Sequence, residues 1–353
     1  SATSSPSRGH PEMPRSERIA ASRRAVSAGR IRSEPPGRGA ARRVRAVLAV
    51  ALVLAGASTS LPAQADATAP PEAVPLLWQV RSSSATVYLY GSIHAAPPQA
   101  VPPPAVVRRA FTLSDALATE VALGDDLTRR LSEAMAQRSE LPPGRALHDY
   151  VDEHGWQRIR RWASSAGFPV DSIERLQPWL VEMLVAESAG LPDGFTAENG
   201  LDAYFAAKAT ARGIPQAGLE TVEEQLDALA GGSFGEQARS LLLALDHAGD
   251  SGSIERLYEA WRSGDVSAIE AIILDHHGGA DDAAVYDRLF TRRNEAWIDS
   301  LVEYLAGGKT TFVIVGAGHL VGHGNVIELL RDRGYAVTRI TDPAQLPTPA
   351  RPR

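Results

Sequence analysis

Short apolar runs, several of them ending in glycine or a carboxylate, divide the chain into predicted strands. A buried strand is the structure that such a run favours. The first two runs are separated by the turn Ser82-Ser83-Ser84, a pattern that predicts a hairpin. The predicted strands are residues 76–80, 86–90, 115–121, 213–220, 311–315 and 335–340.

Between these runs, apolar residues recur at helical spacing. Leu127, Leu131 and Met135 illustrate the pattern within residues 125–191, and a second helical stretch covers residues 222–290. We expect the first of these stretches, residues 125–191, to form a cap inserted between strands. Shorter helices are predicted at residues 105–113, 200–212, 291–305 and 326–333, with glycines as their C-terminal stops in several cases.

One motif occurs at the ends of two predicted strands. Residues 87–90 lead into Gly91-Ser92-Ile93-His94, and residues 311–315 lead into Gly316-Ala317-Gly318-His319. If the two strands are neighbours in one sheet, both imidazoles emerge at its carboxyl edge, where ligands bind in open α/β sheets. We therefore predict an α/β fold with a central mixed β-sheet built from two similar strand–Gly-x-x-His–helix–strand halves, and a large helical insertion forming the cap.

Two carboxylates end predicted strands in the same way. Glu120 follows the run 115–119, and Glu220 ends the run 213–220; a buried carboxylate without a partner is costly, so each is a candidate site residue. Two histidines with such carboxylates form a nitrogen and oxygen site for a divalent metal, which lowers the pKa of bound water and polarises a carbonyl. The metal-free alternative is one histidine as a general base, oriented by a glutamate.

Other polar residues give weaker signals. Arg293, followed by Asn294, could clamp a substrate carboxylate or a site glutamate bidentately, although a surface ion pair is the simpler interpretation. His323 is interpreted as a rim residue, and His276-His277 as the end of a helix rather than a ligand pair. Ser92 lacks the glycine pattern of a nucleophile elbow.

Composition narrows the possible chemistry. The chain of 353 residues has a net charge of −6; residues 1–65 hold eleven arginines and three glutamates, so the remainder carries −14. An acidic body argues against nucleic-acid binding, which needs clustered cations. The absence of cysteine excludes disulfides, cysteine nucleophiles and thiolate ligands. Any metal must be held by nitrogen and oxygen ligands.

The N-terminal region has the pattern of a secretory signal. Basic residues 42–45 precede the apolar residues 46–57, and Ala63-Gln64-Ala65 forms a small-x-small cleavage site. The apolar run is short for a membrane span, so we expect cleavage after Ala65, a periplasmic or secreted location and no stable span afterwards; a retained anchor is the alternative. The predicted organisation is a basic region with signal (1–65), a linker (66–75), one domain (76–341) and a disordered tail (342–353).

Six motifs in order resemble those of the TraB/GumN family. The resemblance extends over residues 76–340, which is nearly all of the predicted mature domain. The motifs are Tyr88-Leu89-Tyr90-Gly91-Ser92-Ile93-His94, Ala118-Thr119-Glu120-Val121, Gly200-Leu201-Asp202-Ala203-Tyr204-Phe205, Gly218-Leu219-Glu220-Thr221-Val222-Glu223-Glu224-Gln225, Arg293-Asn294-Glu295-Ala296-Trp297 and Val315-Gly316-Ala317-Gly318-His319-Leu320-Val321-Gly322.

The resemblance implies a function. The family is similar to the Tiki proteins, which are metal-dependent proteases, and more distantly to erythromycin esterases and ChaN-like haem-binding proteins. It implies an exported metal-dependent hydrolase, a peptidase acting on a peptide or protein substrate, with manganese or cobalt as the ion. His94, Glu120 and His319 would be metal ligands and, with Glu220, catalytic; Arg293 and Asn294 would orient substrate or support the site. The alternatives are a non-enzymatic binder of haem or another ligand, and a polysaccharide-associated accessory protein.

Overall fold

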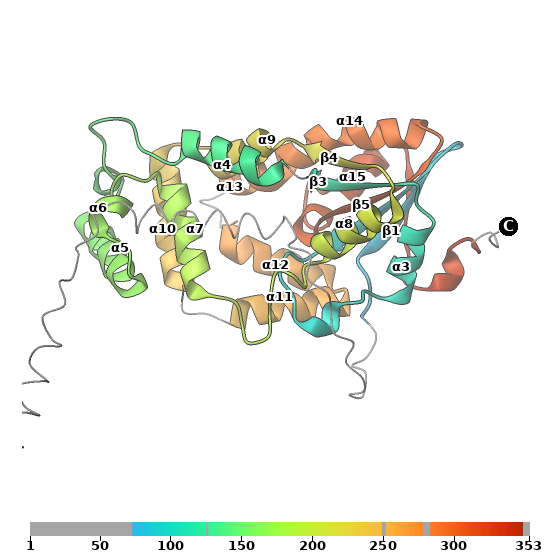
Figure 1. The fold of residues 1–353 in the computed structure, drawn as a ribbon, viewed down its shortest axis with the longest axis horizontal. Coiled ribbons are helices and arrows are strands. Elements are labelled where there is room, and N and C mark those ends of the chain that lie inside the picture. The colour runs from blue at the N-terminus through green and yellow to red at the C-terminus, as the bar shows by residue number, and fades with distance from the viewer. Residues whose placement is uncertain (1–72, 125, 249–251, 278–282, 349–353) are drawn as a thin grey trace, which may run out of the picture. The chain divides into compact units, whose positions relative to one another are not determined.

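The computed structural model describes residues 73–124, 126–248, 252–277 and 283–348 (Figure 1). The predicted signal segment, its cleavage site after Ala65 and residues 66–72 of the linker lie outside these ranges. None of the helices within them is long and apolar enough to cross a membrane.

A mixed six-stranded sheet forms the centre of the fold, as predicted. Its strand order is β4-β3-β5-β2-β1-β6. The four strands β4, β3, β5 and β2 are parallel, whereas β1 is antiparallel to β2 in the predicted hairpin and also antiparallel to β6. The strands are β1 (Leu77–Arg81), β2 (Thr86–Ser92), β3 (Ala116–Val121), β4 (Gln216–Glu220), β5 (Thr310–Gly316) and β6 (Ala336–Arg339).

The two similar halves run in opposite directions from the centre of the sheet. The chain leaves β2 through α3 and returns in β3, beyond β5; it leaves β5 through α15 and returns in β6, beyond β2 and β1. The boundary between β2 and β5 is therefore a topological switch point. In open α/β sheets, ligands bind outside the carboxyl ends of the strands at such a point.

Helices cover both faces of the sheet (Figure 1). On one face, Phe111 of α3 and Phe205 of α8 pack against Phe312 with ring centroids 5.6 and 4.9 Å away. Parallel crossovers are right-handed, so connections that run in opposite directions along the sheet place their helices on opposite faces. On the second face, α14 and α15 contact each other. These helices are α3 (Ala105–Thr112), α8 (Leu201–Arg212), α14 (Arg292–Ala306) and α15 (Val326–Asp332).

The cap is built from two insertions, where the sequence predicted one, because β4 and α8 separate them. The first follows β3 and comprises α4 (Leu127–Arg138), η3 (Leu147–Tyr150), α5 (Glu153–Ala166), α6 (Val170–Ile173) and α7 (Pro178–Ala189). The second follows β4 and comprises α9 (Val222–Leu229), α10 (Phe234–His247), α11 (Gly252–Ser263), α12 (Val266–His277), α13 (Ala283–Tyr286) and the π-helical turn η4 (Asp287–Thr291).

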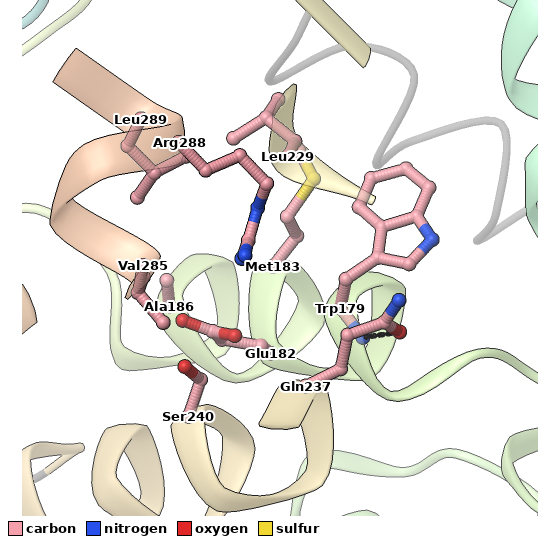
Figure 2. A pocket seen from close by; sticks show the side chains of 10 residues that line it. All are labelled: Trp179, Glu182, Met183, Ala186, Leu229, Gln237, Ser240, Val285, Arg288 and Leu289. Carbon is pink, nitrogen blue, oxygen red and sulfur yellow. Dashed lines mark hydrogen bonds between the residues drawn. The ribbon is translucent and has the colours of Figure 1, made fainter. Parts of the chain in front are cut away.

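Most of the cap has a hydrophobic core of its own, centred on Leu147, Ile159 and Leu241. Between α7, α10 and α13 this core leaves a cavity of about 200 Å³ (Figure 2). Trp179, Met183 and Leu289 are among the residues that line it. The cap is thus held together by its own apolar contacts, independently of the groups at the sheet edge.

The segment after β6 is ordered as far as it is described. A 3-10 helix, η6, covers Pro343–Gln345, and Leu346 is buried. Arg109 of α3 donates to the carbonyl oxygens of Leu346 and Pro347 at 3.2 and 2.6 Å. Residues 342–348 therefore pack onto the domain, where the sequence predicted the start of a disordered tail.

Candidate functional site

The two Gly-x-x-His motifs lie side by side, as predicted. Strands β2 and β5 pair in parallel, and their last residues, Ser92 and Gly316, are partners in the register. His94 follows two residues after Ser92, and His319 follows three residues after Gly316. Both histidines therefore emerge at the carboxyl edge of the sheet, at the switch point.

Three candidate residues converge on Gly316. A Cβ atom built on this glycine would lie 3.2 Å from Glu120 Oε1, 3.6 Å from His94 Nε2 and 3.8 Å from His319 Cδ2. These separations place the two imidazoles far inside the roughly 12 Å that two ligands of one metal can span. Glycine leaves the space between the three side chains open.

Glu120 is fixed by hydrogen bonds from three elements. Its Oε1 accepts from the Gly316 N–H at 2.7 Å. Its Oε2 accepts from Arg293 at 2.8 Å and from the side-chain amide of Gln225 at 3.2 Å. A capping box of Thr221 and Glu224 starts α9 directly after β4 and so positions Gln225. The carboxylate is therefore tied to β5, α14 and α9 at once.

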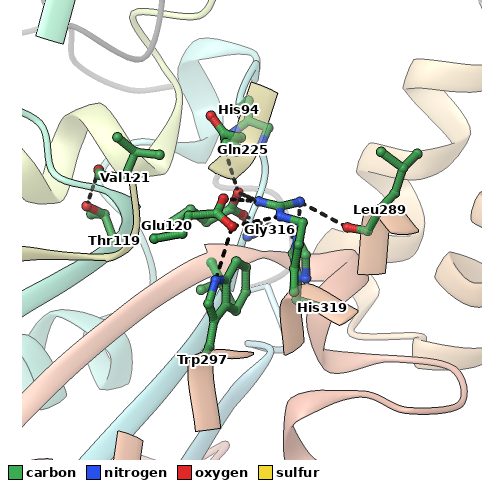
Figure 3. A network of polar contacts seen from close by, with 12 residues as sticks. His94, Thr119, Glu120, Val121, Gln225, Leu289, Trp297, Gly316 and His319 are labelled. Atoms are coloured by element: carbon green, nitrogen blue, oxygen red, sulfur yellow. Dashed lines mark hydrogen bonds and ion pairs between the residues drawn. The ribbon is translucent and has the colours of Figure 1, made fainter. Parts of the chain in front are cut away.

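Arg293 joins the site elements through all five of its N–H groups. Figure 3 shows the network of polar contacts that includes Glu120, Leu289 and His319. Its Nε and one Nη bind Glu220 bidentately at 3.0 and 2.5 Å. The remaining donors reach Glu120, the Leu289 carbonyl at 3.0 Å and His319 Nε2 at 3.2 Å. Arg293 thus clamps Glu220 bidentately, which is one of the contacts considered for it from the sequence. No N–H is left for a substrate, so the structure shows Arg293 as a positioning group.

His319 is buried, not presented by an open loop. It lies in the 3-10 helix η5 (Ala317–Leu320) and is 3% exposed. Its Nδ1 lies 2.7 Å from Asn294 Oδ1, and Asn294 donates its own amide to the Gly324 carbonyl at 2.9 Å. Nδ1 must therefore carry the proton, which leaves Nε2 as the acceptor for Arg293. Asn294 thus sets the tautomer of His319, and it is buried and does not line the cavity described below.

His94 is held by Asp202, which was not predicted to be a site residue. Its Nδ1 lies 3.2 Å from Asp202 Oδ2, and Ser92 donates to Oδ1 of the same carboxylate at 3.0 Å. Asp202 lies in the first turn of α8, where Gly200 passes so close to the His94 carbonyl that a Cβ would overlap it. In the sequence, the glycine two residues before Asp202 was the available signal for a close contact at this position. Ser92 serves to orient Asp202.

Glu220 is held by a second set of contacts. Besides Arg293, its Oε2 accepts from the Trp297 indole at 3.2 Å. The Trp297 ring also lies against His319, with centroids 4.4 Å apart. Glu220 therefore binds Arg293 but does not line the open space. It supports the site through that arginine.

The environment separates the charge states of the two histidines. Burial lowers the pKa of His319 to about 3, so the ring is neutral. Desolvation alone would also lower the pKa of His94, but the Asp202 carboxylate raises it to about 9. Half of the His94 side chain is exposed.

The two carboxylates also differ, although they share one guanidinium. Burial would raise the pKa of Glu120, but the imidazoles, Arg293 and the Gly316 N–H bring it far below its ordinary value. Burial raises the pKa of Glu220, and the Glu120 charge adds to that effect. Glu120 is therefore the ionised carboxylate that faces the histidines.

The donor types suit a divalent metal, but the donors are not gathered around one point. Among the described residues, no three His, Asp or Glu side chains are placed to hold an ion together. His94 Nε2 and Glu120 Oε1 face the open space beside Gly316. The Nε2 atom of His319 accepts from Arg293, and that bond must break before His319 can bind a metal.

The remaining histidine candidates do not join this cluster. The His323 ring contacts the Tyr286 ring at a tilt of 57°, with ring centroids 4.9 Å apart, and does not line the cavity described next. His276-His277 end α12, as predicted for a helix end, and their side chains lie outside the described part of the structure.

A cavity of about 620 Å³ opens over the cluster. His94, Glu120, Arg293 and His319 lie on its floor together with Asp202. Its walls come from the cap and are formed mainly by leucine, isoleucine and phenylalanine side chains. The polar groups therefore meet any bound molecule at one end of an apolar chamber.

Known sequences place the chain among relatives. The sequence model of the TraB/PrgY/gumN family matches residues 76–339. An uncharacterized protein from Treponema pallidum (strain Nichols) is 22% identical over 276 residues, which is 73% of this chain and 80% of that protein. The uncharacterized protein YbaP from Escherichia coli (strain K12) is 25% identical over 245 residues, 69% of this chain and 87% of YbaP. No solved structure matches the chain.

Arg293→Met tests the energetic weight of the arginine. It leaves two buried carboxylates without their cation, so we expect a loss of about 3–5 kcal/mol in the free energy of unfolding, measured by urea denaturation. Arg292→Met is the matched control: its side chain is 71% exposed and paired with Asp287, so its cost should stay below about 1 kcal/mol. Equal effects of the two substitutions would contradict the central position of Arg293.

The charge states can be read directly by NMR of the imidazole nitrogens in protein treated with EDTA. We expect His319 to stay neutral, with its proton on Nδ1, from pH 8 down to pH 5, and His94 to be charged at pH 7. An unfolded histidine has a pKa near 6.5. The buried His319 therefore costs stability as the pH falls from 6.5 toward 3, and the His94–Asp202 pair loses its contribution as the pH rises through about 9. Titration of His319 above pH 6 would refute this assignment.

Proposed function

The chain belongs to the TraB/PrgY/gumN family, and we propose that it is a metal-dependent hydrolase that cleaves peptide bonds. The observation that supports this most is that His94 Nε2 and Glu120 Oε1 both face the open space beside Gly316, with the His319 ring next to it. That space lies at the switch point of the sheet and at the end of a cavity large enough for a small ligand or a peptide segment.

Each polar residue would have a distinct part in the reaction. His94 and Glu120 would hold the metal ion, with His319 joining them once Arg293 releases its Nε2. Manganese or cobalt suits such nitrogen and oxygen donors. When bound, the ion would lower the pKa of a water molecule and polarise the substrate carbonyl.

The supporting residues fix the geometry of the donors. Asp202 holds the His94 ring through Nδ1 and so directs Nε2 toward Gly316, which is the usual role of a carboxylate behind a ligating histidine. Asn294 does the same for His319. Arg293 balances the charges of Glu120 and Glu220. The apolar walls would exclude bulk water from the reacting groups.

A non-enzymatic haem binder is the other candidate, and the cavity supports it less. Haem carries two carboxylates, which a binding site meets with cations or hydrogen-bond donors. Arg293 is the one lysine or arginine side chain that lines the described cavity, and its N–H groups are all in use. A Soret band on addition of haem would favour the binder.

Export is proposed from the sequence. A basic segment, an apolar run and Ala63-Gln64-Ala65 support delivery to the periplasm or the cell exterior. Because the chain has no cysteine, a bound metal would have nitrogen and oxygen ligands in any compartment.

The purified chain should cleave an unstructured peptide with added Mn²⁺ or Co²⁺, and EDTA should abolish the cleavage. His94→Ala and Glu120→Gln should each lower kcat/KM by about 100-fold or more, because each removes a group at the reacting centre. His148→Ala is the matched control, since His148 makes a similar pair with Glu174 in the cap, with Nδ1 to Oε1 at 2.6 Å. Cleavage that survives EDTA would instead support metal-free acid–base catalysis by His94. Full activity of the His94 variant would refute both forms.

Gly316→Ala tests the open space itself. The backbone at Gly316 has φ −53°, which alanine adopts without strain, so the protein should fold normally. The added methyl group would press on Glu120 Oε1 and fill the space before His94 Nε2, and we expect kcat/KM to fall about 100-fold. The control Gly235→Ala meets no atom closer than Ser233 Oγ at 3.9 Å and should leave activity unchanged. An active Gly316→Ala protein would place the chemistry elsewhere.

A further inference from the structure

The walls of the large cavity carry no charge. Elements α4, α7, α9, α11, α12 and η4 all contribute side chains to it, and Gln225 and Tyr258 are the two polar ones among them. Every ionisable carboxylate, imidazole or guanidinium on the cavity belongs to the floor formed by the sheet edge, α8, α14 and η5. The chemistry and the walls are thus supplied by different parts of the chain.

Several large apolar side chains on the lining of this cavity are exposed or half-buried. Four large hydrophobic side chains are exposed among the described residues, and two of them, Leu191 (46%) and Leu229 (36%), lie on its lining. Ile273 and Phe290 are half-buried there as well. Exposed apolar patches that adjoin a site mark the surface on which a ligand rests.

The apolar walls extend as far as the histidine motif. A Cβ atom on Gly318, the residue before His319, would lie 2.9 Å from Ile273 Cδ1 and 2.7 Å from Phe290 Cε1. Substrate atoms next to the reacting carbonyl must therefore contact these side chains. A charged group there would lose its hydration without gaining a partner, which is costly.

From these contacts, and resting on the proposed hydrolase function, we propose that the substrate is a peptide segment with large aliphatic or aromatic side chains on both sides of the cleaved bond. The cap flanks the polar floor from two directions, since α4 and α9 lie on one side of the sheet ends and α11 and α12 on the other (Figure 1). An extended peptide that crosses the floor would contact both walls. An acyl ester has one apolar chain and would use one of them.

The proposal predicts a strong sequence preference in cleavage. Peptides with leucine or phenylalanine at the positions flanking the cleaved bond should have kcat/KM at least ten-fold above otherwise identical peptides with aspartate or lysine there. Ile273→Asp, on α12, and Leu229→Asp, on α9, should each reduce cleavage of the apolar peptide at least ten-fold. Leu229 is already 36% exposed, so this variant should fold.

Leu274→Asp is the matched control, because Leu274 is adjacent to Ile273 on α12 but is 38% exposed and does not line the cavity. It should change kcat/KM by less than two-fold. Equal rates for apolar and charged peptides, or equal effects of Ile273→Asp and Leu274→Asp, would overturn the proposal.

Binding separates this inference from the proposed function. The same fluorescein-labelled peptides are titrated into the His94→Ala protein, and fluorescence polarisation reports their affinity without cleavage. If no peptide is cleaved by the unmodified chain, the hydrolase proposal fails, yet tighter binding of the apolar peptide by at least ten-fold would still support the inference. Binding of dansyl-undecanoate with no binding of the apolar peptide would overturn the choice of a peptide.

Discussion

The site depends on one buried guanidinium. Arg293 connects the ends of β3 and β4, the π-helical turn η4 and the 3-10 helix η5 through Glu120, Glu220, Leu289 and His319. Its five N–H groups have five acceptors, so a shift of any of these elements breaks a buried hydrogen bond and leaves a charge uncompensated. The arginine therefore fixes the position of both carboxylates and of one histidine before any ligand is present. It also occupies the lone pair of His319 that a metal would need, which ties metal binding to the loss of one of its bonds.

The other histidine, His94, is held by a separate set of contacts. Asp202 holds His94 from α8, on the opposite face of the sheet from Arg293, and half of the His94 side chain stays exposed to the cavity. The site thus combines a rigid, buried part around Arg293 with an accessible part around His94. The apolar cap encloses the space above both. Such a division places the reacting groups on a fixed base while leaving one imidazole open to a bound molecule.

Much of this arrangement could be predicted from the sequence, for local reasons. A strand that ends in Gly-x-x-His shows where its histidine emerges, and parallel pairing of two such strands brings His94 and His319 to one edge. Glu120 and Glu220 were recognisable because each ends an apolar run. Asp202, Gln225 and Trp297 were missed as site residues because they lie on helices and reach the site through packing over about 75–110 residues of sequence, which helical periodicity does not encode. Two of the five acceptors of Arg293, the Leu289 carbonyl and His319 Nε2, were equally hidden, since they come from a π-helical turn and a 3-10 helix whose geometry depends on tertiary packing.

The most direct test of the proposed metal site is an anomalous difference map from crystals of the protein soaked in Mn²⁺. We expect one strong peak within bonding distance of His94 Nε2 and Glu120, beside Gly316, with the Arg293 bond to His319 Nε2 broken or lengthened. A peak at another place on the protein, or none at millimolar Mn²⁺ with the hydrogen bonds of Arg293 unchanged, would contradict it.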